Sequence, residues 1–211
     1  MIGLAGAHRV GKTTLAIEFA KKHDLEFIKT DASSVFKKRG ITPKDTLHPE
    51  IRLNVQEEIL KTLRDQYLSV DGNLRITDRT PIDMMAYTIA NLSNAIMDDD
   101  MQKRYFKYLK DCIDLTNQMF SVIVVVQPGI PIIDEPDKAP ANEAYIDHLS
   151  HLIMGLTVGE RIKVDHYYIP RYMTDIERRI EAVEFAMNRT LERHDRFLKT
   201  AAESGRPIIP H

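Results

Sequence analysis

The chain has 211 residues and a formal net charge of -2, with 43% hydrophobic and 28% charged residues. These are the values of an ordinary globular domain, and they exclude wholesale disorder and a fibrous repeat. The near-neutral charge gives no global electrostatic reason to expect a nucleic-acid binder, although a local basic patch is compatible with it.

We expect a single domain over residues 1–211, since this length suits one sizeable core. The longest aliphatic run, Val122 to Val126, is far too short to span a membrane, and the amino terminus lacks the features of a secretory signal. Cys112 is the single cysteine, so an intrachain disulfide is impossible. These features predict a cytoplasmic protein without membrane association.

Residues 1–5 form a short apolar run that predicts a strand, and residues 14–23 show helical spacing. Between them the chain reads Gly6-Ala7-His8-Arg9-Val10-Gly11-Lys12-Thr13, a full match to G-x-x-x-x-G-K-[ST] in the required context of strand, loop and helix. The backbone of this loop, continued by Thr14, is expected to surround the phosphates of ATP. Lys12 should bridge the β- and γ-phosphates, and the Thr13 hydroxyl should bind Mg²⁺.

A second strand is expected over residues 25–30, then a loop with one helical turn, a helix over 49–70 and a third strand over 74–77. The third strand ends at Asp78 and Arg79. Carboxyl ends of parallel strands share one edge of the sheet, so Asp78 should lie near the phosphates. Asp78 is expected to orient or deprotonate the acceptor hydroxyl, or to hold Mg²⁺ through water. Arg79 is suited to bind an acceptor phosphate or a transferring oxygen through two hydrogen bonds. A helix cap with a surface ion pair is the alternative for these two residues.

The remaining segments continue the alternation. Helical patterns cover residues 82–96 and 101–120. In the first, Asp83 and Tyr87 face the same way and either touch the acceptor or pack. The second is preceded by an N-cap cluster at Asp98, Asp99 and Asp100. Residues 121–127 predict a buried central strand, followed by a proline-rich loop over 128–140. A helix over 141–156, a fifth strand over 161–168 and a long helix opened by Thr174 and Glu177 and stopped by Gly205 and Pro207 complete the pattern.

This order of elements predicts the α/β class, with about five parallel strands between helices on both faces. Together with the glycine-rich loop, it predicts the three-layer fold of P-loop NTPases.

Two stretches resemble the P-loop nucleoside and nucleotide kinases, in particular thymidylate kinases, nicotinamide riboside kinases and phage-type AAA-domain nucleotide kinases. One is the phosphate loop, in which Arg9 stands where some thymidylate kinases carry a loop arginine. The other, from Asp78 to Tyr87, is similar to D-R-[YHST]-x-x-[SD]-x-x-A-Y. The resemblance implies that Arg9 stabilises transition-state charge and that residues 128–156 form a lid, whose cation is Lys138. His8 replaces the aspartate usual in those thymidylate kinases, so thymidylate specificity does not follow.

The sequence thus predicts an ATP- and Mg²⁺-dependent kinase acting on a nucleoside or nucleoside monophosphate. Its expected catalytic residues are Lys12, Asp78, Arg9 and Arg79, and its expected metal ligands are Thr13 and Asp78. Two alternatives stay open. One is a kinase for a hydroxymethyl-modified pyrimidine in DNA, with Lys37, Lys38 and Arg39 on backbone phosphates. The other is an ATP-binding regulatory switch without an acceptor. A homodimer is compatible with either.

Overall fold

The computed structural model describes residues 1–30, 32–42, 45–69, 74–132 and 141–204. Five strands and seven helices are defined within these ranges. The strands are β1 (Ile2–Ala5), β2 (Glu26–Ile28), β3 (Arg75–Thr77), β4 (Val122–Val126) and β5 (Asp165–Ile169). The helices are α1 (Lys12–His23), α2 (Ala32–Lys38), α3 (Pro49–Leu68), α4 (Pro81–Leu92), α5 (Asp99–Met119), α6 (Glu143–Thr157) and α7 (Ile176–Ser204).

The strands form one parallel sheet in the order β2-β3-β1-β4-β5. All residues of β1 and β4 are buried, because these central strands are covered on both faces. The predicted α/β class with a five-stranded parallel sheet is therefore confirmed. The fifth strand begins at Asp165 and not at Arg161, so its expected start was wrong by four residues.

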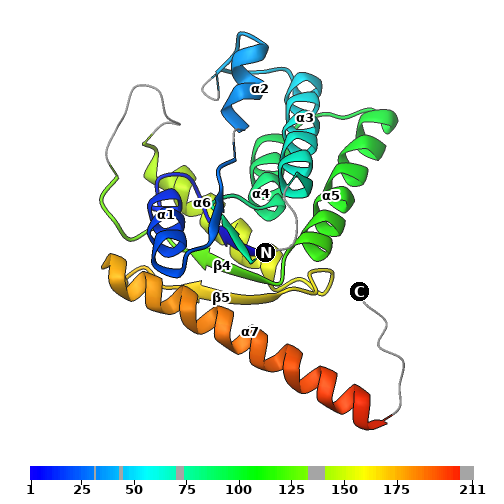
Figure 1. Ribbon diagram of the computed structural model, residues 1–211. Helices are drawn as coiled ribbons and strands as arrows, with labels where there is room; N and C mark the ends of the chain where they lie inside the picture. Colours follow the sequence, from blue (N-terminus) through cyan, green and yellow to red (C-terminus); the bar gives the residue numbers. More distant parts are fainter. Residues whose placement is uncertain (31, 43–44, 70–73, 133–140, 205–211) are drawn as a thin grey trace.

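Helices cover both faces of the sheet, as expected for the three-layer fold. On one face α1 contacts α7, and α7 runs along β4 and β5. On the other face α4 packs against α3, α5 and α6, and α2 packs on α3. Figure 1 shows this division, with α3, α4 and α5 grouped on one side and the long α7 on the other.

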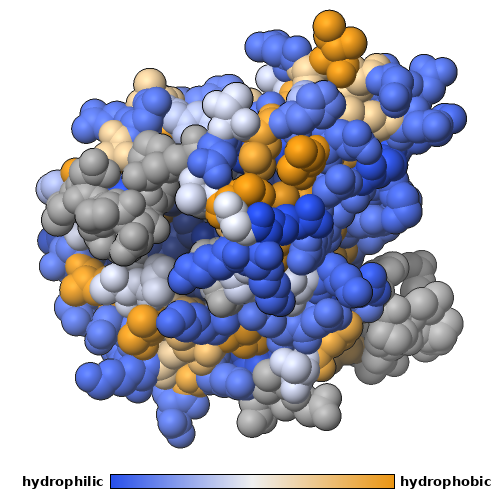
Figure 2. Space-filling view, turned by 90° about the horizontal axis from the view of Figure 1, so that it is seen from above, coloured by the Kyte–Doolittle hydropathy of each residue, from blue (hydrophilic) through white to orange (hydrophobic). Residues whose placement is uncertain are grey.

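Aliphatic and aromatic side chains from all layers form one buried core, in which Tyr67, Tyr108 and Phe19 are the largest fully enclosed groups. The face seen in Figure 2 is mostly hydrophilic, and its apolar atoms fall into several separate groups. Within the ranges that the model describes, none of the helices combines the length and apolarity that a membrane crossing requires.

The amino ends of α5 and α7 can be compared with the predicted N-cap residues. Asp98 caps α5, since its Oδ1 accepts a hydrogen bond of 2.8 Å from the N–H of Met101, as predicted. The predicted start of α7 at Thr174 is wrong: Asp175 Oδ1 accepts the N–H of Arg178 at 3.0 Å. Both residues suit an N-cap, and only the backbone register decides between them. Gly205 and Pro207, expected to stop this helix, lie outside the described residues.

Gly129, in the loop that follows β4, packs closely against the loop that follows β5. A Cβ atom on Gly129 would lie 1.9 Å from the carbonyl oxygen of Arg171, so the two chain segments approach more closely than any side chain permits. Gly129→Ala is therefore expected to lower the free energy of unfolding by about 1–3 kcal/mol. Gly155→Ala is the control, since its Cβ meets nothing within 4 Å in α6, and it should raise stability by roughly 0.5–1 kcal/mol. Urea denaturation of both variants measures this, and an unchanged midpoint for Gly129→Ala would contradict the close approach.

Candidate active site

The phosphate loop connects the carboxyl end of β1 to the amino end of α1. Gly6 (φ 152°) and Gly11 (φ 86°) adopt backbone conformations that favour glycine, and Arg9 also has a positive φ of 63°. No side chain caps the amino end of α1 at Gly11, and the first helical hydrogen bond runs from the N–H of Leu15 to the Gly11 carbonyl. The N–H groups of the first turn and the helix dipole therefore favour an anion at this end.

Lys12 lies inside this loop, with only 9% of its surface exposed. Its Nζ donates hydrogen bonds of 2.6 Å to the carbonyl oxygens of Gly6 and Ala7. Burial lowers the pKa of the Lys12 ammonium from 10.5 to about 8; Asp83 opposes this fall, and Arg79 adds to it. A polyanion in the loop would favour the charged ammonium.

Asp78 stands directly across from the start of α1. Its Oδ2 accepts a hydrogen bond of 2.5 Å from the Thr13 hydroxyl, and its Oδ1 accepts one of 3.2 Å from the Thr30 hydroxyl. The residue follows β3, a neighbour of β1 in the sheet, which explains why positions far apart in sequence meet here. The structure thus brings together Thr13 and Asp78, the two predicted metal ligands.

Asp83 and Tyr87 support the phosphate loop from α4. Asp83 is 1% exposed, and its carboxylate accepts the N–H groups of Gly6 at 2.8 Å and of Thr80 at 2.9 Å. The Tyr87 hydroxyl accepts the N–H of His8 at 3.1 Å and lies 2.9 Å from His8 Nδ1. Burial raises the pKa of the Asp83 carboxyl, and the nearby Lys12 charge opposes that rise. These residues hold the loop, a role that the sequence interpretation missed.

Arg79 follows Asp78 and is half-buried. Its carbonyl oxygen accepts the hydroxyl of buried Tyr67 at 2.7 Å, which fixes the backbone at this turn. The Arg79 charge acts to lower the pKa of Lys12, Asp83 and Tyr87, against the rise that burial causes in the latter two. Among the described residues no hydrogen bond or ion pair involves the Arg79 guanidinium. The cap at this turn is formed by Thr80 with Asp83, not by Asp78.

Aromatic side chains gather on the side of the loop that faces α4 and α6. The His8 ring lies 6.1 Å, centroid to centroid, from both Tyr87 and Tyr145. Asn91 Nδ2 donates a 3.0 Å hydrogen bond to the Tyr145 hydroxyl. Burial raises the pKa of Tyr145, while the Asn91 hydrogen bond and the charge of Arg52 on α3 oppose the rise.

Gln56 lies one helical turn beyond Arg52 on the same side of α3. It is only 5% exposed, and its Oε1 has no hydrogen-bond partner among the described residues. A buried amide oxygen without a partner is uncommon, because losing its hydrogen bond to water costs free energy. Of these two residues of α3, it is Arg52 whose charge acts on Tyr145.

Comparison with known proteins places this site in a family. The model of a family described as "AAA domain" matches residues 1–111, which is more than half of the chain and includes the phosphate loop, Asp78 and Arg79. The chain belongs to the AAA domain family. No curated protein matches it.

Solved structures show how the AAA domain of this chain is folded. A deoxyadenosine kinase from M. mycoides with dCMP and a flexible dCDP bound matches with a TM-score of 0.64 at 16% identity, covering 89% of this chain and 97% of that one. The same kinase with dCTP gives 0.63 at 15% identity, covering 89% and 98%. YorR protein from Bacillus subtilis, in complex with phosphorylated GDP, gives 0.51 at 16% identity, covering 92% and 97%. These likenesses confirm the predicted P-loop kinase fold.

Two arginines flank β5, and neither lies in the phosphate site. Arg161 precedes β5 and therefore lies at the amino edge of the parallel sheet, opposite the phosphate loop. Arg171 follows β5 but pairs with Asp147 of α6. The expected lid over residues 128–156 is described only in part, because Lys138 lies outside the described residues.

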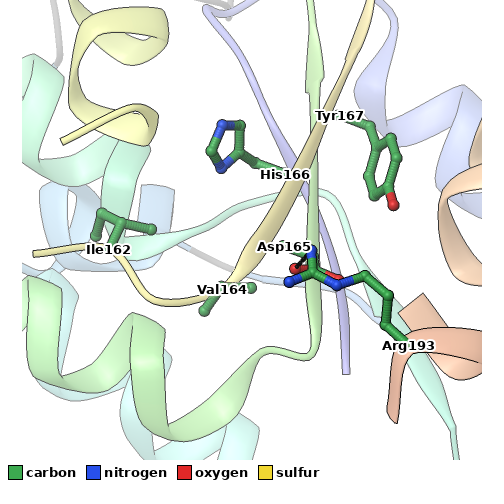
Figure 3. A pocket seen from close by; sticks show the side chains of 6 residues that line it. All are labelled: Ile162, Val164, Asp165, His166, Tyr167 and Arg193. Atoms are coloured by element: carbon green, nitrogen blue, oxygen red, sulfur yellow. Dashed lines mark hydrogen bonds and ion pairs between the residues drawn. The ribbon is translucent and has the colours of Figure 1, made fainter. Parts of the chain in front are cut away.

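A shallow pocket opens at the amino end of β5. The residues lining it are Ile162, Val164, Asp165, His166, Tyr167 and Arg193. Figure 3 shows His166 and Tyr167 on opposite sides of the strand, and Arg193 reaching from α7 to Asp165, to which it is paired at 2.6 Å. This pocket is at the sheet edge that lacks the phosphate loop, so it is not the candidate site.

Proposed function

We propose that the chain is an ATP-dependent phosphotransferase acting on a nucleoside or nucleoside monophosphate. The observation that carries this proposal is that Asp78, at the end of β3, lies beside the phosphate loop of Lys12 and Thr13 and accepts the Thr13 hydroxyl. The Asp78 carboxylate accepts two hydroxyls at 2.5 and 3.2 Å, and the guanidinium of adjacent Arg79 has no partner among the described residues, an arrangement that also suits an acceptor hydroxyl or phosphate.

The structural neighbours support the same class of reaction. One is called a deoxyadenosine kinase and was solved with dCMP, dCTP or dATP, and another holds a phosphorylated GDP. At 15–18% identity these names do not transfer by themselves. They agree with the chemistry of the residues present here.

In the proposed reaction the acceptor oxygen attacks the γ-phosphorus of ATP, the bond to the β,γ-bridging oxygen breaks, and ADP leaves. Asp78 orients the acceptor hydroxyl and accepts its proton. Lys12 leaves the Gly6 and Ala7 carbonyls and binds β- and γ-phosphate oxygens. Arg9 and Arg79 stabilise the negative charge of the transferring oxygens or of an acceptor phosphate.

The residues at the start of α1 fit a magnesium ion. Mg²⁺ prefers oxygen ligands and keeps several waters, so it is held by few protein groups together with substrate phosphates. The Thr13 hydroxyl and the Asp78 carboxylate supply such oxygens next to the loop. Among the described residues, no cluster of three or more His, Cys, Asp or Glu side chains could hold a metal independently. When bound here, Mg²⁺ would neutralise phosphate charge.

The aromatic side of the loop is the proposed place for the acceptor base. His8, Tyr87 and Tyr145 offer aromatic rings, and the Asn91 amide lies beside them at the Tyr145 hydroxyl. Stacking on rings and hydrogen bonding to amides are the interactions by which proteins bind a single base. This arrangement favours a free nucleoside or nucleotide. It gives no comparable support to a DNA acceptor, because Arg39 of the basic group already pairs with Glu58 at 2.8 Å.

A transfer assay with γ-labelled ATP and Mg²⁺ tests the proposal on a panel of nucleosides, nucleoside monophosphates and duplex DNA that contains hydroxymethyl pyrimidines. Label in a free nucleoside or monophosphate is the expected result. Label in DNA only, with transfer that weakens steeply as salt rises, would replace this proposal by the DNA kinase. ATP binding without any labelled acceptor would favour a regulatory switch.

The pH dependence of ATP binding follows from Lys12. A bound triphosphate favours the charged ammonium and so raises its pKa above the value of about 8 in the free protein. The complex then holds more protons than the free protein, and affinity is expected to fall as pH rises through 8 toward 10. Phosphate groups finish ionising near pH ~6, below this range. Titration of a fluorescent ATP analogue from pH 7.5 to 9.5 measures it, and Lys12→Met should bind more weakly but without this slope.

Arg9→Ala is expected to lower kcat by roughly 10³-fold, because a loop arginine that neutralises transferring oxygens acts mainly in the transition state. Arginine and alanine both carry a Cβ atom, so the positive φ of 63° at this position strains both equally, and the substitution should leave the shape of the loop unchanged. Steady-state kinetics separates the cases, since a rise in KM alone would mean that Arg9 only binds nucleotide. Arg178→Ala on the exposed side of α7 is the control.

A further inference from the structure

A buried arginine lies behind the phosphate loop, contributed by α7 from the far end of the sequence. Arg179 is only 2% exposed, although it belongs to the first turn of a helix that is polar on its outer face. The N–H of Arg179 donates to the Asp175 carbonyl at 3.1 Å, so the capped start of α7 fixes where this side chain begins. The burial of its charge is thus built into the packing of α7 against the loop.

The Arg179 guanidinium contacts the phosphate loop directly. Its Nη1 donates a hydrogen bond of 2.9 Å to the Val10 carbonyl oxygen, and its Nε donates one of 2.6 Å to the Met173 carbonyl. Its Nη2 has no hydrogen-bond partner among the described residues. A Cβ atom on Gly11 would lie 3.2 Å from Nη1 and 3.1 Å from Ile130, so the arginine fits against the loop closely because that position is glycine.

The contact with Val10 determines the direction of a phosphate-binding group. The carbonyl of Val10 and the N–H of Gly11 belong to one planar trans peptide, and they point in opposite directions. A hydrogen bond that holds this carbonyl outward therefore turns the Gly11 N–H toward the inside of the loop. A cation on the carbonyl also polarises the peptide and makes its N–H a stronger donor.

The charge of Arg179 has no acidic partner in the described part of the chain. Burial lowers the pKa of the guanidinium, and no neighbouring carboxylate acts against this. A buried cation is ordinarily paired, because isolated burial is costly. Polyphosphate bound on the inner side of the loop would bring negative charge to within one peptide unit of it.

We propose that Arg179 is a positioning residue of the phosphate site, which orients and polarises the Val10–Gly11 peptide and uses the bound polyphosphate as its counter-charge. The proposal rests on the nucleotide binding of the proposed function, and it does not require phosphate transfer. It differs from a purely structural link between α7 and the loop in one respect. The contribution of Arg179 should grow with the number of phosphates on the ligand.

Equilibrium binding of ATP, ADP and AMP, each measured without an acceptor, tests the proposal on four variants of the full chain. Arg179→Met removes charge and donor, Arg179→Gln keeps a neutral donor, and Arg179→Lys keeps the charge. Arg178→Met is the matched control on the exposed side of the same turn. The ratio of ATP affinity to AMP affinity is expected to fall about tenfold in the methionine and glutamine variants. It should fall less than about threefold in the lysine variant and stay unchanged in the control.

A structural role gives a different pattern. In that case the melting temperature without ligand falls in all three Arg179 variants while the ratio of ATP to AMP affinity stays at the wild-type value, and the proposal is overturned. Where the methionine variant does not fold, the lysine and glutamine variants decide by the same ratio. Wild-type protein that binds ATP but labels no acceptor would remove the kinase proposal and leave this one standing.

Discussion

Replacing Lys12 by alanine is expected to abolish phosphoryl transfer, with a loss of kcat/KM of at least about 10³-fold. The Lys12 Nζ already lies within the phosphate loop, where it donates to the Gly6 and Ala7 carbonyls at 2.6 Å. Removing it takes away charge where the β- and γ-phosphates are proposed to lie, in a site where solvent screens little. Label transfer from γ-labelled ATP to the preferred acceptor measures the loss.

The stability of the Lys12 variants separates a damaged site from a damaged fold. Burial disfavours the charged ammonium and lowers its pKa to about 8. Lys12→Met, which keeps the length of the side chain without its charge, should therefore unfold at the same or a higher denaturant concentration than the wild type. A stable Lys12→Met protein without transfer supports the proposed role. A stable variant that still transfers label at the wild-type rate would contradict it.

The parts of this site that the sequence predicts are those set by local pattern. The phosphate loop from Gly6 to Thr13 is contiguous, and its glycines, lysine and threonine have fixed spacing. Asp78 was predicted to lie close to it because it ends a strand, and parallel strands end at one edge of a sheet. The apolar run of β4 identified a strand inside that sheet, covered on both faces. In each case the physical rule acts within a few residues or along a single strand.

The supporting residues required knowledge of tertiary packing. Whether Asp83 and Tyr87 face an acceptor or the phosphate loop depends on how α4 is rotated against β1, which helical spacing alone does not fix. One local signal existed, since Thr80-x-x-Asp83 has the spacing of a capping box that the structure shows. Arg179 gave no such signal, because an arginine on an amphipathic helix is ordinarily exposed. Its partner Val10 is 169 residues away.

Asp78→Asn is expected to lower kcat by about 10²–10⁴-fold while ATP affinity changes less than about threefold. The amide has the shape of the carboxylate, and the Thr13 and Thr30 hydroxyls each donate or accept, so the local geometry should persist. Asp83→Asn should behave differently. Its carboxylate accepts two backbone N–H groups at 2.8 and 2.9 Å, and an amide nitrogen facing one of them leaves it unpaired, which lowers stability and ATP binding together.

Titration with Mg²⁺ distinguishes the two roles proposed for Asp78. If the carboxylate chiefly holds the ion next to Thr13, the asparagine variant needs more Mg²⁺ for half-maximal transfer, and high Mg²⁺ restores much of its rate. If it chiefly accepts the proton of the acceptor hydroxyl, the loss of kcat persists at saturating Mg²⁺. Asp100→Asn, at a carboxylate that is 91% exposed in the first turn of α5, is the control that should change neither quantity. Wild-type transfer by Asp78→Asn at every Mg²⁺ concentration would exclude the carboxylate from both roles.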